Sequence, residues 1–194
     1  MGDQLIDLVT ASAWAYAIVL GFVALDALIP LVPGEAVVIT AAVLAADGEL
    51  SVVLVGAAAL VGSFIGDNTA YRVGAGVGDR PVRRLLRGDR GRRMLGWATR
   101  QLEVRGAAVI VTARFVPGGR TATNLTAGTL ALPWRRFVTA AGIAALLWSV
   151  YVTGLGYVGG TTFRDEEWKA IALSLAVALL VASTGELVRR LRTA

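Results

Sequence analysis

Residues 114–120 read Arg-Phe-Val-Pro-Gly-Gly-Arg and lie between two apolar segments of a 194-residue chain. A second break, residues 30–35, reads Pro-Leu-Val-Pro-Gly-Glu. Proline ends a helix because it lacks an amide hydrogen and restricts the residue before it, and glycine allows the chain to turn. Since a membrane interior tolerates charge and irregular backbone only inside protein or beside a cavity, two such breaks predict a functional site.

The composition indicates a polytopic membrane protein rather than a soluble domain. The chain is 56% hydrophobic, with a mean hydropathy of +0.65, which is high for a soluble protein. It contains no Cys and no His, so disulfides, thiolate chemistry and imidazole ligation are excluded. We expect no metal, no cofactor, no catalytic residue and no enzymatic activity.

The basic residues predict topology and not nucleic-acid binding. The net charge is +5, and residues 79–105 alone carry nine arginines against three acidic residues. Because arginines gather in connections between apolar segments, the positive-inside rule places 79–105 in the cytoplasm. We expect a multi-pass protein of the bacterial plasma membrane that has no nucleic-acid partner.

Segment lengths predict an all-α fold with two re-entrant hairpins of half-helices, 13–46 and 106–132. The apolar limbs 36–46 and 106–116 have about 11 residues each, or roughly 16 Å of helix, whereas crossing the hydrocarbon needs about 20 residues. The remaining segments are predicted as an interfacial helix (1–12), a cytoplasmic segment (79–105) and full transmembrane helices (50–78, 137–160 and 170–188).

The expected membrane side of each charged segment relates the two halves of the chain as an inverted repeat. If 106–132 returns to the cytoplasm, every Arg-rich segment lies inside, and the acidic residues at 47–49 and 165–167 lie outside. In each half, a short limb, a Pro-Gly tip, a second short limb and a full span then follow one another along the chain. This order of elements is typical of transporters that contain an inverted repeat. Residues 13–31 are nearly long enough to cross alone, so the side of the N-terminus stays open.

Four charged residues inside apolar segments are the principal site candidates. Each costs about 2.5–3.5 kcal/mol at the bilayer centre, so Glu35, Asp67, Arg114 and Arg120 must pair, contact water or bind a ligand. The planar guanidinium groups of Arg114 and Arg120 suit a phosphate. Glu35 and Asp67 are assigned to proton coupling, because a buried carboxylate can take up a proton. The competing interpretation is a pair of structural salt bridges.

Further residues are expected near these charges. Arg120 begins the second limb of its hairpin, so the amides of Thr121, Ala122 and Thr123 are expected to be free to bind the same anion. Trp148 is interpreted as packing or cavity wall. The expected lining of the site is Asp26, Gly34, Gly118, Gly119, Thr121, Thr123, Asn124 and Trp148. Gly62/Gly66 and Gly156/Gly160 are interpreted as helix-packing pairs.

A set of motifs resembles the bacterial DedA family of membrane proteins, which carry a VTT-type (SNARE-associated) domain. The matching residues run from about Asp26 to Gly160 and comprise Pro33-Gly34-Glu35, Gly66-Asp67, Arg114–Arg120, Ala127-Gly128, Phe137, Gly142, Trp148 and Gly154–Gly159. One departure is Ala140-Ala141-Gly142, where the family pattern leads us to expect an Asn. The resemblance implies two re-entrant hairpins, with Glu35 and Asp67 matching the family's membrane carboxylates and Arg114 and Arg120 its arginines.

The resemblance also implies a function. The expected activity is translocation of a polyprenyl phosphate carrier, such as undecaprenyl phosphate, across the plasma membrane and coupled to the proton-motive force. The alternatives are a phospholipid flippase or scramblase, a proton-coupled carrier of small solutes or for pH homeostasis, and a scaffold with a salt-bridged core. The expected partners are a lipid phosphate, protons and membrane lipids. The particular lipid, the coupling ion and formation of a homo-oligomer stay open.

Overall fold

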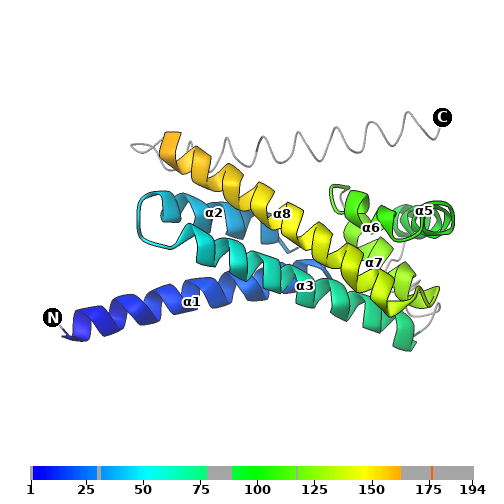
Figure 1. Ribbon diagram of the computed structural model, residues 1–194, viewed down its shortest axis with the longest axis horizontal. Coiled ribbons are helices and arrows are strands. Elements are labelled where there is room, and N and C mark those ends of the chain that lie inside the picture. The colour runs from blue at the N-terminus through cyan, green and yellow to red at the C-terminus, as the bar shows by residue number, and fades with distance from the viewer. Residues whose placement is uncertain (1, 30–31, 78–88, 117, 163–175, 177–194) are drawn as a thin grey trace.

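A computed structural model describes residues 2–29, 32–77, 89–116, 118–162 and 176. Every regular element in these ranges is a helix, so the predicted all-α class is confirmed there (Figure 1). The helices are α1 (Gly2–Asp26), α2 (Gly34–Ala46), α3 (Val52–Val77), α5 (Asp89–Arg105), α6 (Ala108–Ala113), α7 (Gly119–Thr129) and α8 (Trp134–Thr162). The predicted span 170–188 lies outside the described residues except for residue 176.

Two of these helices, α3 and α8, are long and apolar enough to cross a membrane. They contain 26 and 29 residues, or roughly 40 Å each at 1.5 Å per residue, and they match the predicted spans 50–78 and 137–160. By contrast, α2 has 13 residues and α7 has 11, so neither reaches across about 30 Å of hydrocarbon alone.

Helix α1 differs from the expected division at residue 12. It is one helix from Gly2 to Asp26, whereas the sequence predicted an interfacial helix over 1–12 and a separate limb from residue 13. Its part from Ala13 to Asp26 is an apolar stretch. Residues 10–15 contain neither proline nor glycine, so hydropathy changes there without any residue that would interrupt the backbone.

Each half of the chain packs its second short helix against the long helix of the other half. Helix α2 lies against α8, and α7 lies against α3. Glycines allow these close approaches: a Cβ at Gly156 would lie 2.7 Å from the Ile39 carbonyl oxygen, and one at Gly128 would overlap the Tyr71 carbonyl oxygen.

The two predicted glycine pairs are confirmed as packing positions. Gly62 and Gly66 lie on α3 against the backbone of α1, and Gly156 and Gly160 lie on α8 against α2. Small residues at such positions let helices approach closely. Around these contacts, α1, α2, α3 and α8 share one apolar core, formed by Val19, Val23, Val38, Ile39, Ala42, Val55, Ala59 and Val152 with the Trp148 ring.

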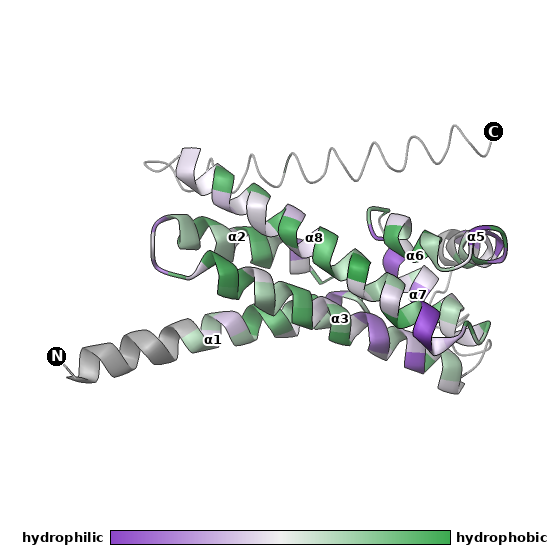
Figure 2. Cartoon of the chain, viewed as in Figure 1, coloured by the Kyte–Doolittle hydropathy of each residue, from purple (hydrophilic) through white to green (hydrophobic). Residues whose placement is uncertain are grey.

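Helices α3 and α8 run in opposite directions (Figure 1), and charged residues lie near their ends. The acidic turn with Asp47 and Glu49 precedes α3. At the other end, the Arg72 guanidinium lies 5.3 Å from the centroid of the Trp134 ring, beside Arg135 and Arg136. Figure 2 shows hydrophilic residues gathered where α3 ends and α8 begins. This separation of charge agrees with the topology expected from the positive-inside rule.

Candidate functional site

The first helix break brings Asp26 against the start of α2. Asp26 is the last residue of α1, and α2 begins at Gly34. A Cβ on Gly34 would lie 2.9 Å from the Asp26 Cβ and 3.3 Å from its Oδ2. Glycine is therefore needed at Gly34 so that the second helix can begin directly beside this carboxylate.

The second break places Arg114 and Arg120 on the two sides of one turn. Arg114 follows the end of α6, and Arg120 is the second residue of α7. Gly118 has φ +71°, a left-handed conformation that favours glycine. On Gly119, a Cβ would lie 2.7 Å from the Ala113 carbonyl oxygen. Both glycines thus permit the tight turn that brings the arginines together.

One expectation about this turn is wrong. The Ala122 amide donates to the Gly118 carbonyl oxygen at 3.2 Å, so it is not free to bind an anion. Thr123 lies one residue deeper in α7, where its amide belongs to the regular i→i−4 ladder. The expectation is therefore wrong for the amides of Ala122 and Thr123, and the arginine side chains are the principal anion-binding groups that this break offers.

Asp67 lies at the centre of the site. It is on α3 and only 1% exposed. Its Oδ2 accepts a hydrogen bond from Arg114 Nη1 at 2.7 Å. Its Oδ1 accepts from Arg120 Nε at 2.7 Å and from Asn124 Nδ2 at 2.8 Å. One carboxylate thus bridges both arginines, and the amide of Asn124 fixes its orientation.

Asp26 and Ser63 complete the set of hydrogen-bond acceptors. Arg120 Nη1 donates to Asp26 Oδ2 at 3.0 Å, which joins the first break to the second. Arg120 Nη2 donates to the Ser63 carbonyl oxygen at 3.3 Å. Arg114 Nη2 donates to the Ser63 hydroxyl. Arg120 consequently contacts groups from α1 and α3, although it belongs to α7.

The Trp148 ring covers the pair of arginines from α8. Its centroid lies 5.0 Å from Arg114 Cζ and 6.0 Å from Arg120 Cζ. A guanidinium at this distance is attracted to the negative face of the indole, by about 0.5–2 kcal/mol. Trp148 therefore packs in the core, as predicted, and its ring also makes a specific contact with the charged groups, which was not predicted.

This network has equal numbers of positive and negative charges, but some of its buried polar atoms lack a hydrogen-bond partner. Two arginines face the two carboxylates of Asp26 and Asp67. Among the described residues, Arg114 Nε and Thr123 Oγ1 are nevertheless buried without a hydrogen-bond partner. A buried donor without an acceptor costs about 1–3 kcal/mol or more, so the site has one cationic donor that a further acceptor would satisfy.

Glu35 stands apart from the arginines. It lies in the first turn of α2 and is partly buried, and no ion pair to it is found among the described residues. Its electrostatic neighbours are Asp26 and Tyr151. The structure therefore gathers Asp26, Asp67, both arginines, Asn124 and Trp148 into one network, and it leaves Glu35 beside that network.

The other predicted lining residues are buried near these groups on α7. Thr121 and Thr123 are 2% and 0% exposed, and their helix packs against α3. The contacts of Ser63 with both arginines were not predicted from the sequence. Its spacing from Asp67 could have revealed them, since residues four apart share one face of a helix. Among the described residues, no three potential metal ligands lie together.

The fold and the site define the class of this protein. It is a helical membrane protein in which two broken helices and a long helix enclose a buried arginine–carboxylate network. Comparison with known proteins agrees with that class. The VTT domain matches residues 32–158. No solved structure matches the chain.

The relatives are membrane proteins of similar length. An uncharacterized membrane protein of Mycobacterium tuberculosis, Rv2637, is 31% identical over 92% of this chain and 84% of its own. Protein DedA of Escherichia coli K12 is 27% identical over 93% of this chain and 85% of its own. An uncharacterized membrane protein of Mycobacterium leprae, ML0287, is 28% identical over 85% and 75%. The chain belongs to the VTT domain (DedA) family, as its motifs predicted.

Proposed function

We propose that this protein translocates a polyprenyl phosphate carrier, such as undecaprenyl phosphate, across the plasma membrane, with Arg114 and Arg120 binding the phosphate. The observation that carries the proposal is the buried pair of arginines bridged by Asp67. Two guanidinium groups held by one carboxylate can bind another bidentate oxyanion of similar size in its place, because carboxylate and phosphate match the same planar fork of donors. The unpartnered Arg114 Nε adds a further donor for that anion.

The proposed architecture consists of two re-entrant hairpins related as an inverted repeat. The first hairpin is formed by the apolar part of α1 with α2, and the second by α6 with α7. Two observations support this arrangement. The chain breaks at 27–33 and at 114–118 next to short helices. In addition, α2 packs on α8 while α7 packs on α3, which is the exchange expected when two similar halves are related by a two-fold axis.

In the proposed mechanism, protons decide whether the arginines are available to the lipid. While Asp67 and Asp26 are ionised, they hold the guanidinium groups. Protonation removes the carboxylate charge, weakens those contacts and leaves the arginines to the phosphate. Loss of the proton would restore the ion pairs and displace the lipid. Glu35 is a further proposed proton carrier, since it is partly buried beside Asp26. No covalent step is required, so we propose a transporter and not an enzyme.

The competing function is a structural lock. The balance of two arginines against two aspartates would suit a network that only holds helices α1, α3 and α7 together. A lock needs the ion pairs to persist at all times, whereas a transport site needs them to exchange with the ligand. A phospholipid flippase or a proton-coupled carrier of a small solute would use the same arginines with another anion.

The test is reconstitution of the purified protein in liposomes with a panel of polyprenyl phosphates, phospholipids and soluble anions. The access of a reagent to the lipid headgroup in each leaflet is measured with and without ΔpH. We expect Arg120→Ala to abolish headgroup binding. We expect Glu35→Gln to leave binding intact and to remove the dependence of translocation on ΔpH.

The matched control is Arg105→Ala, which removes an exposed arginine at the end of α5. Its translocation rate should equal that of the parent protein. If Arg120→Ala and Glu35→Gln both translocate polyprenyl phosphate at the parent rate and with the parent dependence on ΔpH, the proposed roles are wrong.

A further inference from the structure

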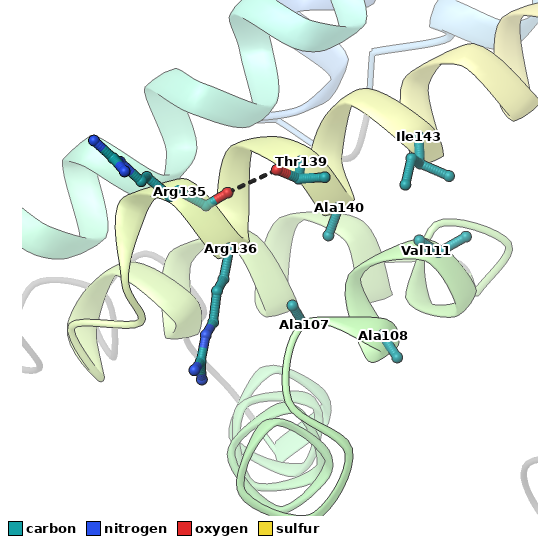
Figure 3. Close-up of a pocket in the computed structure, with 8 residues that line it drawn as sticks. All are labelled: Ala107, Ala108, Val111, Arg135, Arg136, Thr139, Ala140 and Ile143. Carbon is teal, nitrogen blue, oxygen red and sulfur yellow. Dashed lines mark hydrogen bonds between the residues drawn. The ribbon is translucent and has the colours of Figure 1, made fainter.

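A groove on the outer surface of α8 lies away from the arginine network. It encloses about 430 Å³, which is within the usual range of about 300–1,000 Å³ for ligand sites. Helix α6 and the turn before it form one wall, and the first turns of α8 form the other (Figure 3). Its lining residues are Ala107, Ala108, Val111, Arg135, Arg136, Thr139, Ala140 and Ile143.

Most of this groove is apolar. Three of its residues are alanines, whose small side chains leave room between α6 and α8. Ile143 is 50% exposed at the far end. The one hydroxyl group, Thr139 Oγ1, donates to the Arg135 carbonyl oxygen at 2.8 Å within α8 (Figure 3). The groove therefore offers a hydrocarbon-like surface with no free polar side chain along its length.

One end of the groove is cationic and has no counter-ion from the described protein. Arg136 extends from α8 past the start of α6, while the Arg135 guanidinium points in the opposite direction (Figure 3). No carboxylate lines the groove, and neither arginine forms an ion pair within the described ranges. An unpaired arginine at the end of an apolar groove is complementary to a ligand with an anionic head and a hydrocarbon tail.

The position of the groove fits the boundary between headgroups and hydrocarbon. Arg136 and Ile143 are seven residues apart, or about 10 Å along the helix. Trp134 directly precedes the lining residues Arg135 and Arg136 and is 39% exposed, as is usual for aromatic residues at a membrane interface. A headgroup at Arg136 would thus place the upper part of an acyl chain beside Ala140 and Ile143.

We propose that this groove binds one anionic glycerophospholipid of the leaflet that borders Arg136, with the phosphate on Arg136 and an acyl chain between α6 and α8. Basic pockets between membrane helices are known to recognise anionic lipid headgroups. A second copy of the chain is a poorer occupant, since a two-fold interface would bring Arg136 and its symmetry mate to the same patch. The lipid tail would hold α6, whose end leads directly into Arg114, against α8.

The experiment measures lipid retention by native mass spectrometry of the full chain in micelles that contain phosphatidylglycerol or phosphatidylcholine. A surface arginine contributes about 1 kcal/mol toward an anionic lipid, so phosphatidylglycerol should be retained about fivefold better. We expect Arg136→Gln to remove this preference. Arg135→Gln is the matched control, because it removes the same charge from the same helix turn but from a guanidinium that points away.

A second variant tests the hydrocarbon part of the groove. Ala108 is exposed at the start of α6, so Ala108→Phe should fill the groove without disturbing the core and should lower retention of both lipids. Equal retention of both lipids by the parent protein would overturn the proposal. So would equal losses in Arg135→Gln and Arg136→Gln, which would indicate diffuse attraction. A dimer that Ala108→Phe disrupts would identify a second copy as the occupant instead.

Discussion

Neutralising Asp67 should be the most destabilising single change of charge in the described protein. Asp67→Asn keeps the size of the side chain but removes the charge that accepts hydrogen bonds from Arg114 Nη1, Arg120 Nε and Asn124 Nδ2. Whichever way the new amide is oriented, its NH₂ group faces at least one of these donors. Breaking a buried ion pair by removing one partner costs about 3–5 kcal/mol.

The cost converts into a measurable shift in unfolding temperature. For chains of this length, 1 kcal/mol corresponds to about 2–4 °C, so Asp67→Asn should lower Tm by about 6–20 °C. The assay is thermal unfolding of the purified protein in detergent, followed by tryptophan fluorescence. Asp47→Asn, in the exposed turn before α3, is the matched control, and its effect should stay within about 0.5 kcal/mol.

A double-mutant cycle separates loss of the ion pair from general disruption. Adding Arg114→Gln to Asp67→Asn removes one of the two arginines that the first substitution leaves without its carboxylate. The double variant should therefore be more stable than the sum of the single losses predicts, by about 0.5–3 kcal/mol. A Tm of Asp67→Asn equal to that of Asp47→Asn would refute the central role assigned to this carboxylate.

Three further pairs of substitutions test other parts of the structure, and the effect of each substitution is measured as a change in Tm. Gly74→Ala should destabilise the protein by about 1–3 kcal/mol, because its Cβ would overlap the Leu125 carbonyl oxygen. The control Gly76→Ala lies in the same helix with open space around it, so it should be neutral or stabilising. Equal effects of the two substitutions would contradict the close contact of α3 with α7. Trp148→Leu should cost more than Trp148→Phe, since a benzene ring retains part of the attraction to the guanidinium groups; equal losses would show that only its volume matters. Gly118→Ala should cost about 1–2 kcal/mol because of its left-handed backbone, and Gly118→Asn should cost less; no loss in either would contradict that conformation.

Segment length and backbone chemistry predicted the helical framework well. The prolines and glycines near residues 33 and 118 marked both breaks, and the short apolar runs predicted that α2 and α7 are not full spans. The start of α1 was predicted less well, because hydropathy falls toward the N-terminus without any residue that ends a helix. A change in hydropathy indicates a change of surroundings, and only backbone chemistry indicates the end of a helix.

The residues that form the site were predicted better than the contacts between them. Asp67 and both arginines could be identified because charges in apolar helices need a reason. Their pairing could not, since a one-dimensional pattern does not show that α7 packs on α3 and not on its sequence neighbour α8. For the same reason Glu35 was expected at the centre, whereas Asp26 makes the contact with Arg120. Ser63 was missed because its contacts depend on two helices that follow much later in the chain.

The packing of α2 on α8 also has a consequence for biosynthesis. Ala46 ends α2 and Trp134 begins α8, so the 87 residues 47–133 must be synthesised before the second helix of the pair starts to emerge. At about 5–20 residues per second, α2 waits about 4–17 seconds for this partner. During that interval the surface around Ile39, which Gly156 later covers, is open to lipid or to the insertion machinery. The first half of the chain therefore reaches its final packing only after most of the second half has entered the membrane.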